Sequence, residues 1–345
     1  MGGTGVSPVT AVLSYSSMAS VVHFSPPGDA LTVDSARLAL FLWLHARQRK
    51  ALFAAPPNQE LQWLGLEPDS EPTTREPPEW AQHLPPIEQS DPSPWGQWSG
   101  QTTLAELREL GVLPEALINF LALQGWQPPK QGDAAREILS REELLALWSP
   151  AALDPVPRKF DFELLRRLNH HWLQQADLDR LAELSLPYYH RVGWAPDPLP
   201  PLVRGWLRDV IRAVLPGLDF LSLLPPRTRL VFDYQPERYM LLPESREALE
   251  REGARAVIRA FGLRALENGW MTVERFRQIL DEVKRETHMT GRNLVQPIRV
   301  MLTGLPFGPE LDDLILIIER GAELPLPLRV KSCRERVVGF CSIFS

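Results

Sequence analysis

The chain has 345 residues, of which 44% are hydrophobic and 23% charged, as is typical of a soluble globular protein. A net charge of −6 excludes a global basic field, and no window reaches the ~18 uninterrupted apolar residues of a membrane span. The two cysteines, Cys333 and Cys341, fit neither a zinc site nor a disulfide framework. We therefore expect a cytoplasmic protein with free thiols.

The charge is distributed unevenly along the chain. Residues 1–160 carry 11 basic and 18 acidic side chains, whereas residues 161–345 carry 26 and 25. The second part is near neutral and rich in arginine, which permits a local RNA-binding face without requiring one.

The first elements predict a strand, a helix and a second strand. Residues 1–20 are small and polar and are typical of a poorly ordered leader. A short strand is expected over 21–24, and a helix over about 36–49 with Asp34 or Ser35 as its N-cap. Residues 51–55 form the second expected strand.

A proline-rich stretch follows. Residues 56–96 contain ten prolines, eight acidic residues and one arginine. This composition favours an extended, solvated linker over a folded core.

The segment 100–126 predicts two short helices, because Thr103 with Glu106 forms a capping box and Pro114 suits the first position of a helix. A second capping box, Ser140 with Glu143, begins another helix. From residue 159 onward the pattern is helical, with Thr272 as an N-cap, Pro297 and Pro309 as helix starters and Gly304 and Gly321 as stops. The chain is therefore predicted to be mainly α.

The letters of residues 104–126, LAELRELGVLPEALINFLALQGW, resemble the segment after the second signature motif of bacterial glutamyl-tRNA synthetases, which are class I synthetases. Segments 35–66 and 290–320 resemble the same family in the same order. The resemblance implies a helical anticodon-binding domain preceded by a small degenerate α/β remnant. It divides the chain into a leader and nucleotide-fold remnant (1–55), a Pro-rich acidic linker with a short helix (56–99), a stem-contact-like domain (100–160) and an anticodon-binding-like domain (161–345).

The signature residues of that family are absent. By position its HIGH motif falls at Thr32, Val33, Asp34 and Ser35, and the lysine-rich loop ends at Gln97. The family's first-strand arginine falls at His23. ATP and magnesium serve the family, but no catalytic residue, no cofactor and no metal site are expected in this chain.

The resemblance implies tRNA, in particular tRNA-Glu, as the partner, with a full-length synthetase as a further one and neither DNA nor a membrane. RNA loops are bound by arginine planes, aromatic rings and basic side chains. Candidates for these contacts are Arg166, Arg167, Asn169, His170, Arg227, Arg229, Arg255, Arg292 and Arg299. A solvated helix face is the alternative for 166–170, and a cap or ion-pair role is the alternative for Arg299.

Three functions stay open at this point. The first is a tRNA-binding protein that has lost ligase activity. The second is a divergent glutamate–tRNA ligase, which would need a substitute for the missing histidine and lysine. The third is a protein-binding regulatory scaffold or a decaying paralogue, which the acidic proline-rich stretch would suit.

Overall fold

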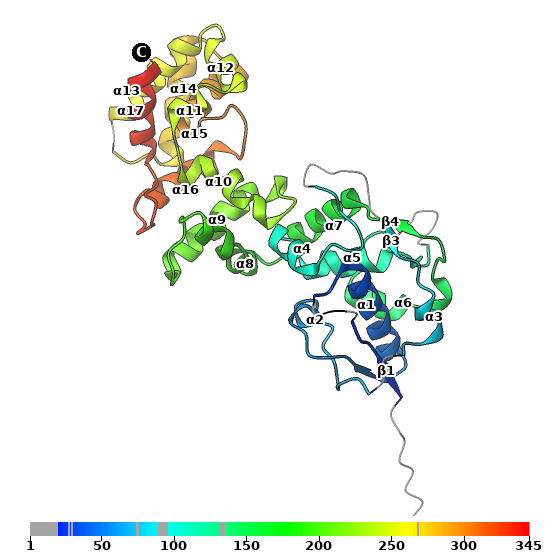
Figure 1. Cartoon of the computed structure of the whole chain (residues 1–345). Coiled ribbons are helices and arrows are strands. Elements are labelled where there is room, and N and C mark those ends of the chain that lie inside the picture. Colours follow the sequence, from blue (N-terminus) through cyan, green and yellow to red (C-terminus); the bar gives the residue numbers. More distant parts are fainter. Residues whose placement is uncertain are drawn as a thin grey trace, which may run out of the picture. The chain divides into compact units, whose positions relative to one another are not determined.

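The computed structural model describes residues 20–26, 28, 30–73, 76–88, 96–130, 136–267 and 269–344. The described chain is mainly helical, as expected, and its few strands are short (Figure 1). The predicted leader, apart from residue 20, lies outside the described residues. Two compact units emerge: unit 1 comprises Met1–Ala105 and Ile118–Asp161, and unit 2 comprises Glu106–Leu117 and Phe162–Ser345. The four-part division from the sequence stays a prediction.

Unit 1 contains the predicted strand–helix–strand motif. Strand β1 (Val21–His23) pairs in parallel with β2 (Leu52–Ala54), and α1 (Val33–Gln48) connects them. Most of α1 is buried, because apolar side chains surround almost its whole circumference. The α/β remnant is therefore a two-stranded parallel ribbon with one crossover helix.

The N-cap of α1 differs from the prediction. Thr32, not Asp34 or Ser35, caps the helix, and its hydroxyl accepts from the Ser35 N–H at 3.2 Å. The Ser35 hydroxyl in turn accepts from the Thr32 N–H at 2.8 Å. Serine thus takes the place that glutamate usually has in a capping box.

The prediction of an extended, solvated linker over 56–96 is wrong at residues 59–66, which dock on the rest of unit 1. Helix α2 (Gln59–Trp63) is followed by Leu64 and Leu66, and Leu61, Leu64 and Leu66 are all fully buried. The chain also joins the ribbon edge, where the Ala55 N–H donates to Ser70 O at 3.1 Å. The average composition does not reveal that three leucines are enough to dock this stretch.

The rest of unit 1 packs around aromatic side chains. Its further elements are α3 (Glu79–Gln82), β3 (Ile87–Glu88), α6 (Arg141–Leu147), which begins with the predicted Ser140 capping box, and β4 (Arg158–Lys159), which pairs in parallel with β3. The Trp148 ring stacks 4.5 Å from Phe41 and lies 5.7 Å from Trp126, between ring centroids. This cluster joins α1 to the distant segment 126–148.

The two helices predicted in 100–126 are α4 (Leu104–Leu110) and α5 (Pro114–Leu123). The boundary between the units falls inside both helices. At Gly111, φ is +90°, and a Cβ there would lie 2.5 Å from the Leu221 backbone nitrogen. Glycine is therefore required both by conformation and by the close approach of the chain.

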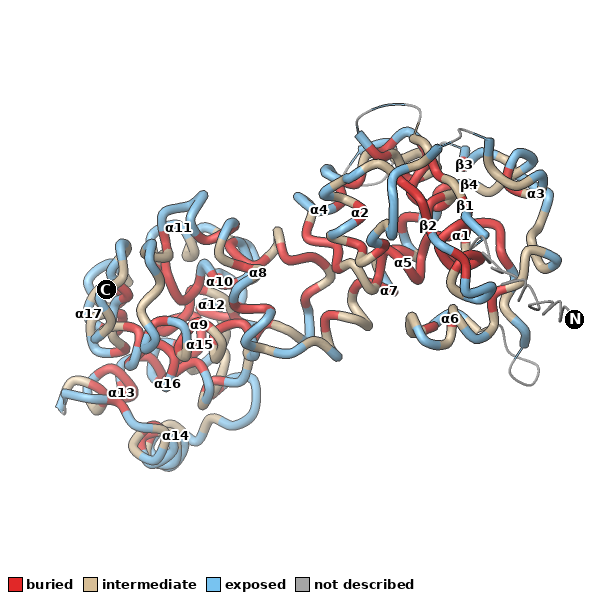
Figure 2. Tube along the Cα trace, turned by 90° about the horizontal axis from the view of Figure 1, so that it is seen from below, coloured by how far each residue is buried: buried red, intermediate tan, exposed pale blue. Residues whose placement is uncertain are grey.

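Unit 2 is an all-helical assembly whose buried positions run along the facing sides of its helices (Figure 2). Its helices are α7 (Phe162–Gln175), α8 (Leu178–Arg191), α9 (Pro201–Val214), α10 (Leu224–Phe232), α11 (Pro236–Tyr239), α12 (Pro243–Glu250), α13 (Ala254–Glu267), α14 (Val273–Thr287), α15 (Arg292–Thr303), α16 (Leu311–Ala322) and α17 (Cys333–Phe344). Within the described residues, no helix is both long and apolar enough to cross a membrane.

Three helix boundaries in unit 2 were predicted wrongly. Pro309 does not start α16, whose N-cap is Glu310 and whose first residue is Leu311. Pro297 does not start a helix but lies inside α15, and Gly321 lies inside α16 instead of ending it. A Cβ on Gly321 would lie 2.6 Å from the Trp206 ring, so this glycine serves packing. Gly304 does end α15 in the left-handed conformation, with φ +89°, and Thr272 caps α14, as predicted.

Candidate functional site

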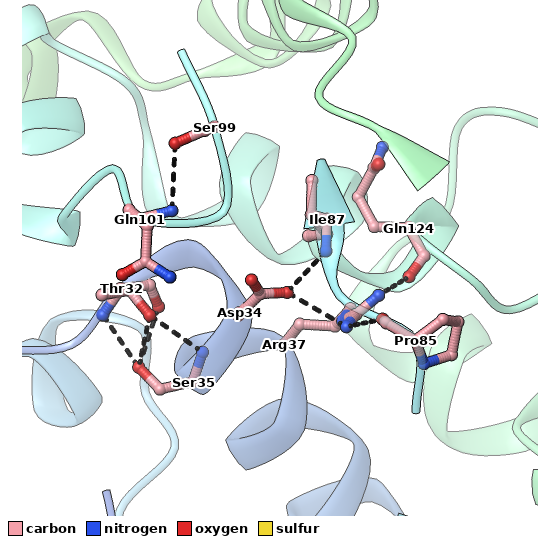
Figure 3. Close-up of polar contacts among 9 residues, drawn as sticks. All are labelled: Thr32, Asp34, Ser35, Arg37, Pro85, Ile87, Ser99, Gln101 and Gln124. Carbon is pink, nitrogen blue, oxygen red and sulfur yellow. Dashed lines mark hydrogen bonds and ion pairs between the residues drawn. The ribbon is translucent and has the colours of Figure 1, made fainter. Parts of the chain in front are cut away.

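Two places bear on function, and each lies within one unit. The first is the N-terminus of α1 in unit 1, where the degenerate signature residues Thr32, Val33, Asp34 and Ser35 lie. Figure 3 shows Thr32, Asp34 and Ser35 of this set. A helix N-terminus binds phosphate when its first N–H groups are free to donate to it. The fate of these donors therefore decides whether the site can hold a nucleotide.

Backbone carbonyls of residues 100–102, just before α4, accept hydrogen bonds from two of these N–H groups. The Val33 N–H donates to Thr102 O at 2.8 Å, and the Asp34 N–H donates to Gly100 O at 3.3 Å. The Ser35 N–H donates to the Thr32 hydroxyl. The first-turn N–H groups of this helix are therefore committed to acceptors within the chain.

Asp34 adds a negative charge at the same place and is itself held. Its Oδ1 accepts from the Ile87 N–H at 3.0 Å and from Arg37 Nη2 at 3.1 Å (Figure 3). A Cβ on Gly100 would clash with Asp34 Oδ2, so only glycine allows this approach. We call Thr32–Arg37 with residues 99–104 the blocked end of α1.

Arg37 fixes the blocked end to the rest of unit 1. Its side chain is 3% exposed and donates to Gln124 O at 2.9 Å and to Pro85 O at 2.6 Å. Burial lowers the pKa of Arg37, and the Asp34 carboxylate opposes that shift. The guanidinium is thus committed to protein carbonyls and one carboxylate.

Two further degenerate positions, His23 and Gln97, lie elsewhere in unit 1. His23 Nδ1 accepts from the Thr73 N–H at 3.4 Å, and Gln97 is exposed. The two positions predicted for the start of the lysine-loop equivalent, Pro94 and Trp95, lie outside the described residues. Across the described chain, no cluster of three His, Cys, Asp or Glu side chains could hold a metal ion.

The second place is a groove of about 840 Å³ in unit 2, which we call the arginine groove. Its lining residues come mainly from α9, α10, α16 and the loop 305–310; the three helices are labelled in Figure 1. Its lining includes four arginines: Arg212, Arg227, Arg229 and Arg320. Three acidic residues, Asp209, Glu310 and Asp313, line it as well.

The carboxylates leave part of this positive charge available. Asp209 binds both Arg212 at 2.8 Å and Arg320 at 2.7 Å, which fixes two guanidiniums with one carboxylate. Arg229 lies 3.6 Å from Asp233, and Arg227 has no polar partner among the described residues. The guanidinium of Arg227 therefore stays available to an anion in this groove.

The groove also offers an apolar, partly aromatic surface. Phe307 is 57% exposed and Leu316 is 47% exposed, although both are large hydrophobic side chains. Phe307 lies on the short loop that follows α15. Arg299 stabilises this loop, because its Nη1 donates to Pro309 O at 2.5 Å. An exposed ring beside guanidiniums can stack a nucleobase while the charges meet phosphates.

The structure brings only two of the nine predicted RNA-contact residues, Arg227 and Arg229, into this groove. Arg299 is 8% exposed, and burial lowers its pKa; it supports the rim, in line with the alternative interpretation of this residue. Arg255 and Arg292 are exposed on α13 and α15 and lie outside the groove lining.

The predicted polar face of α7 is largely a structural contact within unit 2. Asn169 is fully buried: its side chain accepts from the Leu113 N–H at 2.7 Å and donates to Asp219 O at 2.6 Å. Asn169 is therefore not available to RNA. The pKa of Arg166 is raised by hydrogen bonds to Glu163 and Asp219, and His170 Nδ1 lies 3.1 Å from Leu218 O. Arg167 is exposed.

Three residues of the groove were not predicted from the sequence: Arg212, Phe307 and Arg320. Arg212 lies on the polar side of the amphipathic α9, a face that usually signals only solvation. Phe307 carries the clearest signal, because an aromatic residue in a loop rich in glycine and proline has no helical core to fill.

Comparison with known proteins agrees with this geometry. Residues 180–323 match the family model described as "Anticodon binding domain". Glutamate–tRNA ligase of Heliobacterium modesticaldum is 30% identical over 297 residues, which are 84% of this chain and 55% of that protein. Glutamate–tRNA ligase 1 of Caldicellulosiruptor saccharolyticus is 32% identical over 219 residues, 64% of this chain and 44% of that protein.

The fold agrees as well. A solved glutamate–tRNA ligase from Elizabethkingia meningosepticum superposes with a TM-score of 0.62 at 13% identity, covering 94% of this chain and 100% of that one. The chain spans about half the length of the curated relatives it matches. The chain is therefore glutamyl-tRNA synthetase-like in sequence, its residues 180–323 match an anticodon-binding domain, and its fold is similar to that of a solved glutamate–tRNA ligase.

Proposed function

We propose that this protein binds tRNA through the arginine groove and does not ligate glutamate to it. The observation that carries the binding half is the placement of Arg227, Arg229 and Phe307 around one groove within the segment that matches the anticodon-binding model. One stacked base and two phosphates would fit these groups. The relatives are named glutamate–tRNA ligases, which supports a tRNA as the partner, and we propose tRNA-Glu.

The blocked end of α1 supports the absence of ligase activity. Class I chemistry needs groups that stabilise charge developing on the transferred phosphates. Here the first-turn N–H groups of α1 donate to Thr102, Gly100 and Thr32, and a carboxylate, Asp34, takes the place of a donor. An ATP phosphate at this end would meet a negative charge and donors that are already committed.

The binding half is tested by fluorescence anisotropy with labelled tRNA over a range of salt concentrations. The wild type should bind at low ionic strength, and log K should fall linearly with log salt because counterions are released from the phosphates. An Arg227→Gln, Arg229→Gln double variant should reduce both the affinity and the magnitude of that slope, by roughly 0.7–0.9 for each phosphate that it no longer neutralises. Phe307→Ala should cost about 1–3 kcal/mol without changing the slope.

Arg259→Gln is the matched control, because Arg259 is exposed on α13 and lies outside the groove lining. Like each substitution in the double variant, it removes one positive charge. Absence of salt-dependent tRNA binding by the wild type would refute the binding half. Glutamate-dependent ATP–pyrophosphate exchange above background would refute the other half. The second candidate function, a divergent ligase, rests on the activity for which the relatives are named and requires that exchange.

A further inference from the structure

A second basic hollow lies in unit 2, apart from the arginine groove. Its volume is about 730 Å³, and it is lined by Met240, the end of α12, the start of α13 and the last residues of α17. Three arginines line it, Arg246, Arg251 and Arg255, against one acidic residue, Glu250. We call it the Phe344 hollow, after the aromatic side chain at its wall.

The guanidiniums differ in how far they are committed. Arg246 is exposed and has no polar partner among the described residues. Arg251 is held by Gln296 and by Glu247, the latter at 2.6 Å. Arg255 is exposed, and its Cζ lies 5.5 Å from the centroid of the Phe344 ring. Two of the three arginines can therefore turn their donors towards an anion.

The remaining wall is apolar. Leu249 is buried behind it, whereas Ile343 is 38% exposed and the Phe344 ring is half-buried. Phe344 is held by Phe340, 5.1 Å away between centroids, and Arg255 lies over the same Phe344 ring. An aromatic ring with a guanidinium close to it offers a nucleobase a ring to contact and the neighbouring phosphate a cation.

The hollow adjoins the arginine groove along the chain. Tyr239 and Leu242 line the groove, whereas Met240 and Arg246 line the hollow. The short segment 239–242 thus forms a wall of both, and Leu241 on it is 69% exposed.

We infer that the Phe344 hollow is a second RNA contact, which takes a phosphodiester on Arg246 and Arg255 and an unstacked base against Phe344. This inference rests on the proposed tRNA binding. It extends that binding to Ile343 and Phe344, which lie beyond residue 323, where the match to the anticodon-binding model ends. The chemistry recognised is a single-stranded nucleotide, sequence-tolerant and salt-sensitive.

The test is the salt dependence of tRNA affinity for an Arg246→Gln, Arg255→Gln double variant. Its log–log slope should decrease in magnitude by roughly 0.7–0.9 for each phosphate that it no longer neutralises, while the paired control Arg259→Gln, Arg285→Gln leaves it unchanged. Phe344→Leu should weaken binding roughly five- to tenfold at constant slope, because it removes stacking but keeps apolar volume. Arg259 and Arg285 are exposed and line neither cavity.

The outcomes separate this inference from the proposed function. If the Arg227, Arg229 variant loses affinity while the Arg246, Arg255 variant and Phe344→Leu match the wild type, the groove binds RNA and the hollow does not. If an acidic peptide protects the hollow from arginine-selective labelling and tRNA does not, the hollow binds a protein and the inference is overturned. If the wild type binds no tRNA, the proposed function itself fails.

Discussion

Replacement of Arg336 by methionine should destabilise unit 2 more than any surface change. Arg336 lies on α17 and is fully buried. Its Nη1 donates to Leu230 O at 2.6 Å and to Leu302 O at 2.9 Å, and its Nη2 donates to Val231 O at 2.6 Å. Leu230 and Val231 lie at the end of α10, and Leu302 lies at the end of α15, so one guanidinium caps the carbonyl ends of two helices.

The magnitude follows from these hydrogen bonds. Hydrogen bonds to a charged group contribute about 1.5–3 kcal/mol each, and the helix C-termini carry partial negative charge that favours a cation. Burial lowers the pKa of Arg336 to about 10, so the side chain stays charged at neutral pH. Arg336→Met keeps much of the packing but leaves three buried carbonyls without this donor. We expect a loss of about 3–5 kcal/mol in the free energy of unfolding.

Urea unfolding followed by far-UV circular dichroism measures this loss. Arg334→Met, an exposed change on the same helix, is the control and should stay within about 0.5 kcal/mol of the wild type. Arg336→Lys should recover only part of the loss, since one ammonium cannot reach carbonyls on both helices. An Arg336→Met protein within about 1 kcal/mol of the wild type would refute the capping role.

Two further predictions concern buried positions of unit 2. Burial raises the pKa of Glu319 above its usual 4.5, so the unfolded chain loses this proton at lower pH than the folded one, and stability falls as pH rises through the raised value. Glu319→Gln, which keeps an acceptor for the Cys333 N–H, should therefore gain stability relative to the wild type as pH rises from 4.5; a pH-independent difference in urea midpoints would contradict this. Gly111→Ala should lower the free energy of unfolding by about 2–4 kcal/mol, because alanine is strained at this φ and its Cβ would meet Leu221. Gly217→Ala is the control and should cost far less, since a Cβ at Gly217 meets nothing within 4 Å. Equal thermal midpoints of the two variants would contradict the close approach at Gly111.

The sequence predicts local elements well where capping and periodicity agree. The capping box at Ser140, the Thr272 cap and the strands at 21–24 and 51–55 are all confirmed. The burial of the proline-rich stretch was not predicted because proline content describes an average, whereas docking depends on a few leucines such as Leu61 and Leu64. Pro297 was misplaced because proline usually starts a helix, whereas here it is the sixth residue of α15 and gives up one backbone hydrogen bond inside the helix.

The site is harder to predict because it depends on tertiary contacts. Asn169 looks like part of a polar helix face, yet its partners Leu113 and Asp219 lie 56 and 50 positions away in the chain. Arg227 and Arg229 could be named as candidates, but only the fold places them beside Phe307. The absence of the family's histidine and lysine could be seen directly in the sequence. The hydrogen bonds from the first N–H groups of α1 to residues 100–102 could not, because they depend on the fold.

Binding of tRNA by the arginine groove is most directly tested by measuring tRNA affinity against salt concentration for the wild type and for the Arg227→Gln, Arg229→Gln variant. We predict salt-dependent binding by the wild type and a weaker, less salt-dependent binding by the variant. No binding by the wild type at low ionic strength, or identical curves for the two proteins, would contradict the proposed role of this groove.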